Sequence, residues 1–224
     1  MIKNVLIDLD GTLLDFNKGE KNAFIETINK FAGIIPNDDV CNEFSKINEF
    51  YFQEYSHGNM DRKEFHYNRF KMIYEYLNID VDIIKSNEYY IESLKYQANI
   101  YDDVLDTLKY LYDKYDLFIA SNGMNSVQIK RLEKAGINNY FKKIYVSEEI
   151  KYNKPDTKFF EYIFNDLNDF DRDNYIIIGD RLDSDIKGGI DARIKTIYLN
   201  RENITNEINP DYEIKSFNEI SSIL

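Results

Sequence analysis

Acidic side chains follow two apolar segments that lie far apart in the chain. Asp8 and Asp10 belong to VLIDLDGT near the N-terminus, and Asp180 and Asp185 belong to GDRLDSD, which follows the run YIII. A carboxylate next to buried strands is costly to keep ionised unless a cation or hydrogen-bond donors compensate for its lost hydration. Asp8, Asp180 and Asp185 offer hard oxygen ligands, and no histidine or cysteine lies near them in sequence, so these three suit Mg²⁺. A bound ion would also let neighbouring carboxylates stay ionised.

Two further segments could hold an anion. Ser121, Asn122 and Gly123 follow the apolar segment LFIA, and Lys154 precedes a proline a few residues after YVSEE. Ser121 offers a hydroxyl donor, and the next two backbone amides lie at an expected helix N-terminus, where anions are stabilised. Lys154 offers a fixed positive charge. The sequence therefore contains the parts of an oxyanion-binding site.

The spacing of the first acidic pair adds a reaction to this site. Asp8 and Asp10 are two residues apart, so both side chains can face the same pocket from the end of a strand. One carboxylate can attack while the other transfers protons. A carboxylate nucleophile, an acid/base, a metal and an oxyanion cradle together predict phosphoryl transfer through an aspartyl-phosphate.

Short apolar strands alternate with helix-length segments over most of the chain. One helical stripe is marked by Val104, Leu105, Leu108 and Leu111, and another by Ile129, Leu132 and Ala135. This alternation predicts an α/β fold with a doubly wound, Rossmann-like parallel sheet. The carboxyl ends of such strands meet at one edge, so the four polar segments should converge there. The expected strands are Asn4–Leu9, Leu117–Ala120, Lys143–Val146, Tyr175–Ile178 and Thr196–Leu199.

One long segment interrupts the alternation. Residues 16–96 contain no convincing strand, and they follow the expected first strand directly. We therefore expect a core domain of residues 1–15 and 97–224, with an inserted helical cap domain of residues 16–96 beside Asp8 and Asp10. The expected cap helices are Lys18–Ala32, Asp38–Tyr55, Asp61–Leu77 and Asp80–Lys95.

Charge, hydropathy and cysteine content argue against several kinds of partner and compartment. The 224 residues carry a net charge of −12, which argues against binding nucleic acid through a broad basic face. No apolar run approaches the length of a membrane span, and the first residues lack the pattern of a signal peptide. The single cysteine, Cys41, excludes an internal disulfide and fits a reducing compartment, so we expect a cytoplasmic protein. Its oligomeric state is left open by the sequence.

The four polar segments resemble, in order, the four motifs of the haloacid dehalogenase superfamily in its phosphatase branch. The resemblance covers nearly the whole chain, with the helical insertion in the place of that family's cap. It implies that Asp8 is the nucleophile and Asp10 the general acid/base. It also implies that Mg²⁺ is bound by Asp8, by the carbonyl of Asp10 and by Asp180, with Asp185 supporting the ion or its waters.

The phosphoryl group would be held by Ser121 and Lys154, with Asn122 contributing to the same cradle. A narrower resemblance, to the pyrimidine 5′-nucleotidase branch, rests on DLDGTLLDF, SNGMNSVQIKRLEKAGINNYFKKIYVSEEI, KPD and SDIKGGIDA. It implies a nucleoside 5′-monophosphate as substrate. Lys151 and Arg193 depart from this branch, because they stand where it usually has glycine.

Other readings remain open at the level of sequence. The motif residues would contact the phosphoryl group and not the leaving group, so they do not identify the substrate. The nearest alternative is a sugar-phosphate phosphatase, such as one acting on an acylneuraminate phosphate. A dehalogenase would not need the metal site. A phospho-aspartate signalling receiver also combines acidic residues, a hydroxyl and a lysine, but the insertion and the position of Asp10 argue against it. A binding protein with an inactive site is disfavoured, since every motif residue is present.

Overall fold

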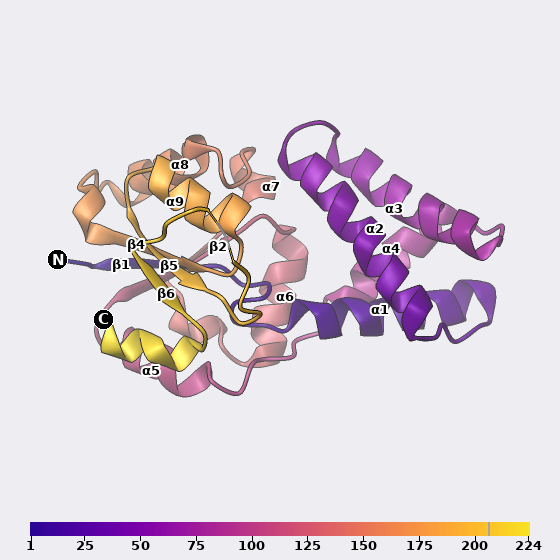
Figure 1. Cartoon of the computed structure of the whole chain (residues 1–224), viewed down its shortest axis with the longest axis horizontal. Helices are drawn as coiled ribbons and strands as arrows, with labels where there is room; N and C mark the ends of the chain where they lie inside the picture. Colours follow the sequence, from indigo (N-terminus) through magenta and orange to yellow (C-terminus); the bar gives the residue numbers. More distant parts are fainter. Residues whose placement is uncertain (206) are drawn as a thin grey trace. The chain divides into compact units, whose positions relative to one another are not determined.

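The computed structural model describes residues 1–205 and 207–224. The chain divides into two compact units, one formed by Met1–Asp15 with Ile100–Leu224 and the other by Phe16–Asn99 (Figure 1). The first unit contains a sheet, and the second is helical throughout its secondary structure. Across the described ranges, no helix combines the length and apolar character needed to cross a bilayer.

The sheet unit is built on six parallel strands in the order β3-β2-β1-β4-β5-β6. The central strand β1 pairs on one side with β2 and on the other with β4, so Asn4 lies opposite both Asp116 and Tyr175. The expected doubly wound parallel sheet is confirmed. The strands are β1 Asn4–Ile7, β2 Asp116–Ser121, β3 Lys143–Val146, β4 Tyr175–Gly179, β5 Lys195–Leu199 and β6 Tyr212–Ile214.

Alternating side chains of the strands feed two separate hydrophobic layers. Val5 and Ile7 of β1 face one layer, and Leu6 faces the other. The first layer packs against α5 (Leu105–Tyr112), α6 (Asn125–Ala135) and a C-terminal 3₁₀ segment, Phe217–Ser222. The second packs against α8 (Thr157–Leu167), with α9 (Lys187–Asp191) on the same face (Figure 1). Shorter helical segments are Asn138–Tyr140, α7 Ser147–Ile150, Arg172–Asn174 and Leu182–Ile186.

Two expected core positions are wrong. Leu105, the first residue of α5, is exposed, whereas Val104, Leu108 and Leu111 of the same expected stripe are buried. Ile129 of α6 is 37% exposed, whereas Gln128 and Arg131 of the same helix are buried. The helix therefore turns a polar pair inward, which an apolar stripe could not predict.

The helical unit consists of four helices that lie close to their expected bounds: α1 Phe16–Ala32, α2 Asp38–Ser56, α3 Arg62–Leu77 and α4 Ile83–Leu94. Three of them begin after a side chain that accepts a hydrogen bond from the first turn, namely Asn37, Asp61 and Asp82. These caps satisfy backbone N–H groups that would otherwise lack partners at each helix start.

Aromatic side chains form the core of the helical unit. Phe44 of α2 stacks on Phe24 at a ring-centroid distance of 4.1 Å, and it also meets Phe70 at 5.4 Å and Tyr90 at 5.6 Å. All four rings are buried. Among the residues that the structure describes, this core draws only on Phe16–Asn99.

Candidate active site

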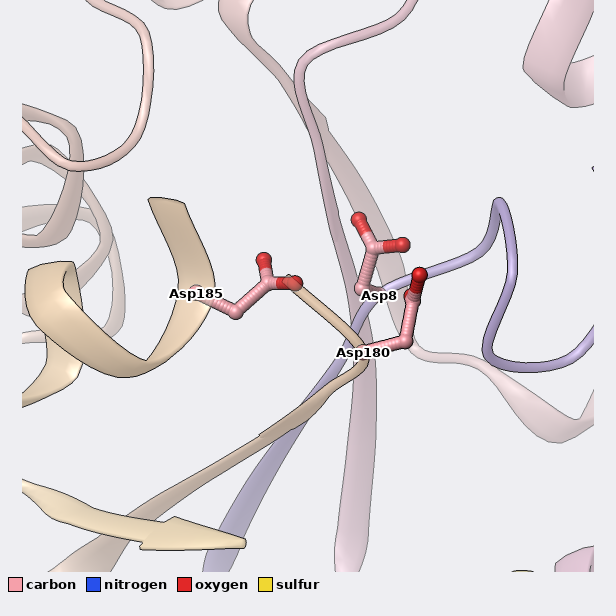
Figure 2. Close-up of side chains that lie close together, drawn as sticks. All are labelled: Asp8, Asp180 and Asp185. Atoms are coloured by element: carbon pink, nitrogen blue, oxygen red, sulfur yellow. The ribbon is translucent and has the colours of Figure 1, made fainter. Parts of the chain in front are cut away.

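Three carboxylates converge at the carboxyl edge of the sheet. Asp8 follows β1 directly and Asp180 follows β4, while Asp185 lies in the helical turn Leu182–Ile186. One carboxylate oxygen from each residue lies within 4.8 Å of the other two, and Figure 2 shows the side chains of Asp8 and Asp180 close together with the carboxyl of Asp185 turned toward them. The central place of β1 in the sheet explains this meeting, because Asp8 then has the end of β4 as its neighbour.

Lys154 is the cation of this cluster. Its side chain is 1% exposed, and its Nζ donates to Asp8 Oδ1 at 2.7 Å, to Asp185 Oδ1 at 2.6 Å and to the carbonyl of Ala120. Burial alone lowers the pKa of the amine, but the carboxylates of Asp185 and Asp8 more than offset burial and hold this pKa above its usual value. Lys151, in contrast, is exposed and donates to the carbonyl of Glu148, outside the cluster.

Asn122 and Ser121 approach the site from the end of β2. The side chain of Asn122 accepts from the backbone N–H of Lys154 at 2.8 Å and donates to the carbonyl of the same residue at 2.9 Å. This two-point contact fixes the segment that carries the lysine. The Ser121 hydroxyl accepts from the backbone N–H of Gly123 at 3.1 Å.

Asp180 depends on two residues of the first motif for its position. Thr12 Oγ1 donates to Asp180 Oδ1 at 2.7 Å. Gly11 has φ +86°, and a Cβ at this position would lie 2.2 Å from Asp180 Oδ2, so only glycine leaves room for the carboxylate. Burial, followed by the charge of Asp185, raises the pKa of Asp180 to about 7.

The cluster carries more negative than positive charge in a buried setting. Burial raises the pKa of Asp8 well above its usual value; Lys154 opposes this rise, while Asp185 and Asp180 add to it. Asp185 also accepts from the backbone N–H of Arg181 at 3.1 Å. Asp183 stands apart, since its side chain is 47% exposed and pairs with Arg181 at 3.0 Å.

The donor set fits a hard divalent cation. Asp8, Asp180 and Asp185 offer carboxylate oxygens only, which suit Mg²⁺ better than the nitrogen- and sulfur-preferring ions zinc and copper. A divalent ion would also offset the excess negative charge that, together with burial, raises the pKa values of Asp8 and Asp180.

Two residues that were not expected at the site from the sequence bind Asp10. Gln128 Nε2 donates to Asp10 Oδ2 at 2.6 Å, and the guanidinium of Arg131 pairs with Asp10 Oδ1. The two residues lie three positions apart on α6 and so share one face of the helix. Their spacing was the available signal, but a glutamine and an arginine at helical spacing usually mark a solvent-exposed face.

Comparison with known proteins places this site in a family. A sequence profile described as haloacid dehalogenase-like hydrolase matches residues 5–199. The HAD-hydrolase YfnB of Bacillus subtilis is 31% identical over 99% of this chain and 95% of its own. A crystal structure of YfnB bound to magnesium, described as revealing interdomain movement, has a TM-score of 0.93 and covers 99% of this chain and 98% of that one, at 30% identity.

Two other relatives have named activities. The pyrimidine 5′-nucleotidase PynA of Streptococcus pneumoniae is 28% identical over 99% of this chain and 94% of its own. The N-acylneuraminate-9-phosphatase of Mus musculus is 26% identical over the whole of this chain and 94% of its own. The profile match spans most of the chain, and the sequence relatives are matched nearly end to end. The chain is a member of the haloacid dehalogenase-like hydrolase family.

Proposed function

We propose that this chain is a Mg²⁺-dependent phosphomonoester hydrolase that works through an aspartyl-phosphate on Asp8. The observation that carries the proposal is the buried contact between Asp8 and Lys154, with Asp180 and Asp185 beside it at the end of the central strand. A carboxylate held against a lysine, with further oxygen ligands around it, suits attack on a dianionic phosphoryl group.

In the first step, an oxygen of Asp8 attacks phosphorus in line with the leaving oxygen. The bond from phosphorus to that oxygen breaks, and Asp10, in its protonated form, gives it a proton so that it leaves as an alcohol. Lys154 and the Ser121 hydroxyl hold the phosphoryl oxygens while the charge is redistributed.

In the second step, Asp10 is ionised and takes a proton from water as the water oxygen attacks phosphorus. The bond from phosphorus to Asp8 breaks, inorganic phosphate leaves, and both carboxyl groups return to their starting states. Asp10 thus serves as an acid and then as a base within one turnover.

Asp8, Asp180 and Asp185, with the Asp10 carbonyl, are the groups that would hold Mg²⁺. When bound, this ion supplies positive charge that shields the nucleophile from the phosphoryl oxygens and stabilises the charge that develops on them. The magnesium-bound structure of YfnB supports the choice of metal.

Nucleoside 5′-monophosphates are the substrates that we propose, supported by the full-length similarity to PynA. Sugar phosphates are the second candidate, favoured by the similarity to N-acylneuraminate-9-phosphatase. We propose the helical unit as the cap, in which selection of the leaving group would reside, because it is inserted after the segment of Asp8 and Asp10.

Phosphate release from a panel of nucleoside monophosphates and sugar phosphates tests the proposal, with Mg²⁺ and with EDTA. We expect metal-dependent turnover that is highest on pyrimidine monophosphates. Asp8→Asn should fold normally and lose at least about 10³-fold in kcat, since the nucleophile is gone. Asp183→Asn is the matched control, because that carboxylate pairs with Arg181 outside the cluster, and it should keep its activity. An active Asp8→Asn protein would contradict the mechanism, and turnover confined to sugar phosphates would contradict the substrate alone.

A further inference from the structure

Both oxygens of the Asp10 carboxylate are engaged by side chains of α6. Gln128 donates to Oδ2 at 2.6 Å, and Arg131 pairs with Oδ1. We propose that Gln128 and Arg131 are positioning residues that fix the orientation in which Asp10 transfers protons. This inference rests on the proposed function, since it concerns the acid/base of that reaction.

The contact of Gln128 and Arg131 with Asp10 belongs to a wider hydrogen-bond network. Gln128 Nε2 also donates to Ser121 Oγ at 2.8 Å, and Gln128 Oε1 accepts from Arg131 at 3.2 Å. One amide therefore ties Asp10 to the hydroxyl that is proposed to hold phosphate. Gly123 leaves the room for this amide, because a Cβ there would lie 2.3 Å from Gln128 Nε2.

The burial of Arg131 is difficult to explain by stability alone. Its side chain is 1% exposed, whereas Asp10 is 27% exposed and can be hydrated in part. A buried ion pair often contributes less to stability than apolar side chains of similar volume. The same helix leaves apolar Ile129 exposed while it buries Gln128 and Arg131. The burial of Gln128 and Arg131 thus fits a role in orienting Asp10 better than a role in packing.

Orientation of Asp10 matters most when the leaving oxygen needs a proton. An alkoxide is a poor leaving group and requires protonation as the bond breaks, whereas 4-nitrophenolate departs without it. Loss of orientation should therefore slow cleavage of a nucleoside 5′-monophosphate or glycerol phosphate much more than cleavage of 4-nitrophenyl phosphate. A defect of general folding or of phosphate binding would slow both reactions alike.

The test is the rate of leaving-group release in single turnovers with enzyme in excess, which reports the first chemical step alone. We expect Arg131→Met to slow release from the alkyl phosphate by about 10- to 100-fold. Release from 4-nitrophenyl phosphate should change by no more than about threefold, which is under 1 kcal/mol. Arg131→Lys, which keeps the charge, should recover part of the alkyl phosphate rate. Lys130→Met, a charge removal on the next residue of the same helix, is the matched control and should leave both rates unchanged.

Thermal unfolding with and without Mg²⁺ verifies that each variant folds and still responds to the metal. Gln128→Met, which has a similar length, provides the comparison if Arg131→Met does not fold. Because it also removes the donor to Ser121, both rates should fall, and the alkyl phosphate rate should fall at least about tenfold more than the 4-nitrophenyl phosphate rate. Equal losses on both substrates, or no loss on either, would overturn the inference and leave the proposed function standing. An unaltered protein that releases no leaving group from any phosphate ester would overturn the proposed function, and the inference with it.

Discussion

Three carboxylates and one lysine meet at the carboxyl edge of the sheet, so the site has more acidic than basic side chains. Lys154 pairs with Asp8 and Asp185, whereas Asp180 receives only the hydroxyl of Thr12 among the side-chain donors described here. Buried charges without full compensation destabilise a folded protein. The uncompensated negative charge therefore lowers the free energy of unfolding, and a bound cation should restore part of it.

The first prediction concerns metal binding by this cluster. Mg²⁺ at 100 times its dissociation constant should raise the free energy of unfolding by about 2.7 kcal/mol, because the ion binds the folded state alone. Thermal unfolding in EDTA and in Mg²⁺ measures the shift. Asp180→Asn should abolish most of the stabilisation while remaining folded, and Asp183→Asn should retain it. A shift of equal size in all three proteins would show that the ion acts elsewhere.

The sequence predicted the meeting of these residues only in part. Asp8 and Asp180 follow strands and Ser121 ends one, so the topology of a parallel sheet was enough to expect them at one edge. The contacts of Gln128 and Arg131 were not predictable, because they depend on how α6 is rotated about its own axis. Gln128 and Arg131 are buried together with Val127 and Leu132, and their polar side chains give no sign in the sequence that they face inward.

At the scale of elements, two helices are followed by residues in the left-handed conformation, which apolar periodicity does not predict. Lys151 and Arg193 adopt left-handed conformations, with φ 71° and 60°, after α7 and near the end of α9. These are the two positions at which the sequence departs from glycine in the resembling branch. A side chain in this conformation costs roughly 1–2 kcal/mol, so the departure changes stability but not the course of the backbone.

Five strands and the four inserted helices were predicted to within a few residues. The sixth strand, Tyr212–Ile214, was missed because it is short, lies at the edge of the sheet and buries one of its three side chains. Nothing in three residues with two exposed side chains separates such a strand from a loop. Its place is decided by pairing with β5, which is a tertiary contact.

The second prediction concerns His66 on α3. Burial, and then the charges of Arg69 and Arg62, lower the pKa of this histidine from 6.5 to about 3. Above pH 6.5 the side chain is neutral in both states and contributes no pH dependence. As the pH falls from 6.5 toward 3, the unfolded chain binds a proton that the folded chain excludes, so stability is lost.

Between pH 7 and pH 5 this loss should amount to about 1 kcal/mol, after a discount for the partial exposure of the ring. Urea unfolding at the two pH values measures it, and His66→Gln should show a loss smaller by that amount. His57→Gln, at the exposed end of α2, is the matched control and should behave as the unaltered protein. Identical pH dependence in all three would refute the assignment to His66.

At the scale of the whole molecule, the two units have independent interiors. The sheet unit has apolar layers on both faces of its strands, and the helical unit has the aromatic core around Phe44. A unit with its own core can open without disrupting the other. Stability is therefore expected to be divided between the units.

The third prediction follows from this division. Phe44→Ala should destabilise the helical unit by about 3–5 kcal/mol, because it removes a buried ring that contacts three other rings. Hydrogen exchange followed by mass spectrometry should show faster exchange in α1 to α4 and unchanged exchange in the six strands. Phe50→Ala, at a 56% exposed position of the same helix, is the control and should alter neither. Equal acceleration in both units would mean that they unfold as one.

The central position of β1 also has a consequence for how the protein is made. A ribosome completes β1 first, yet its partners β2 and β4 begin only at Asp116 and Tyr175. The helical unit has every residue of its core once Asn99 has been added. Local helical contacts form fast, whereas pairing of distant strands is slow. During synthesis the inserted helices can thus fold while the strand that precedes them, with both of its edges unpaired, waits for the rest of its sheet.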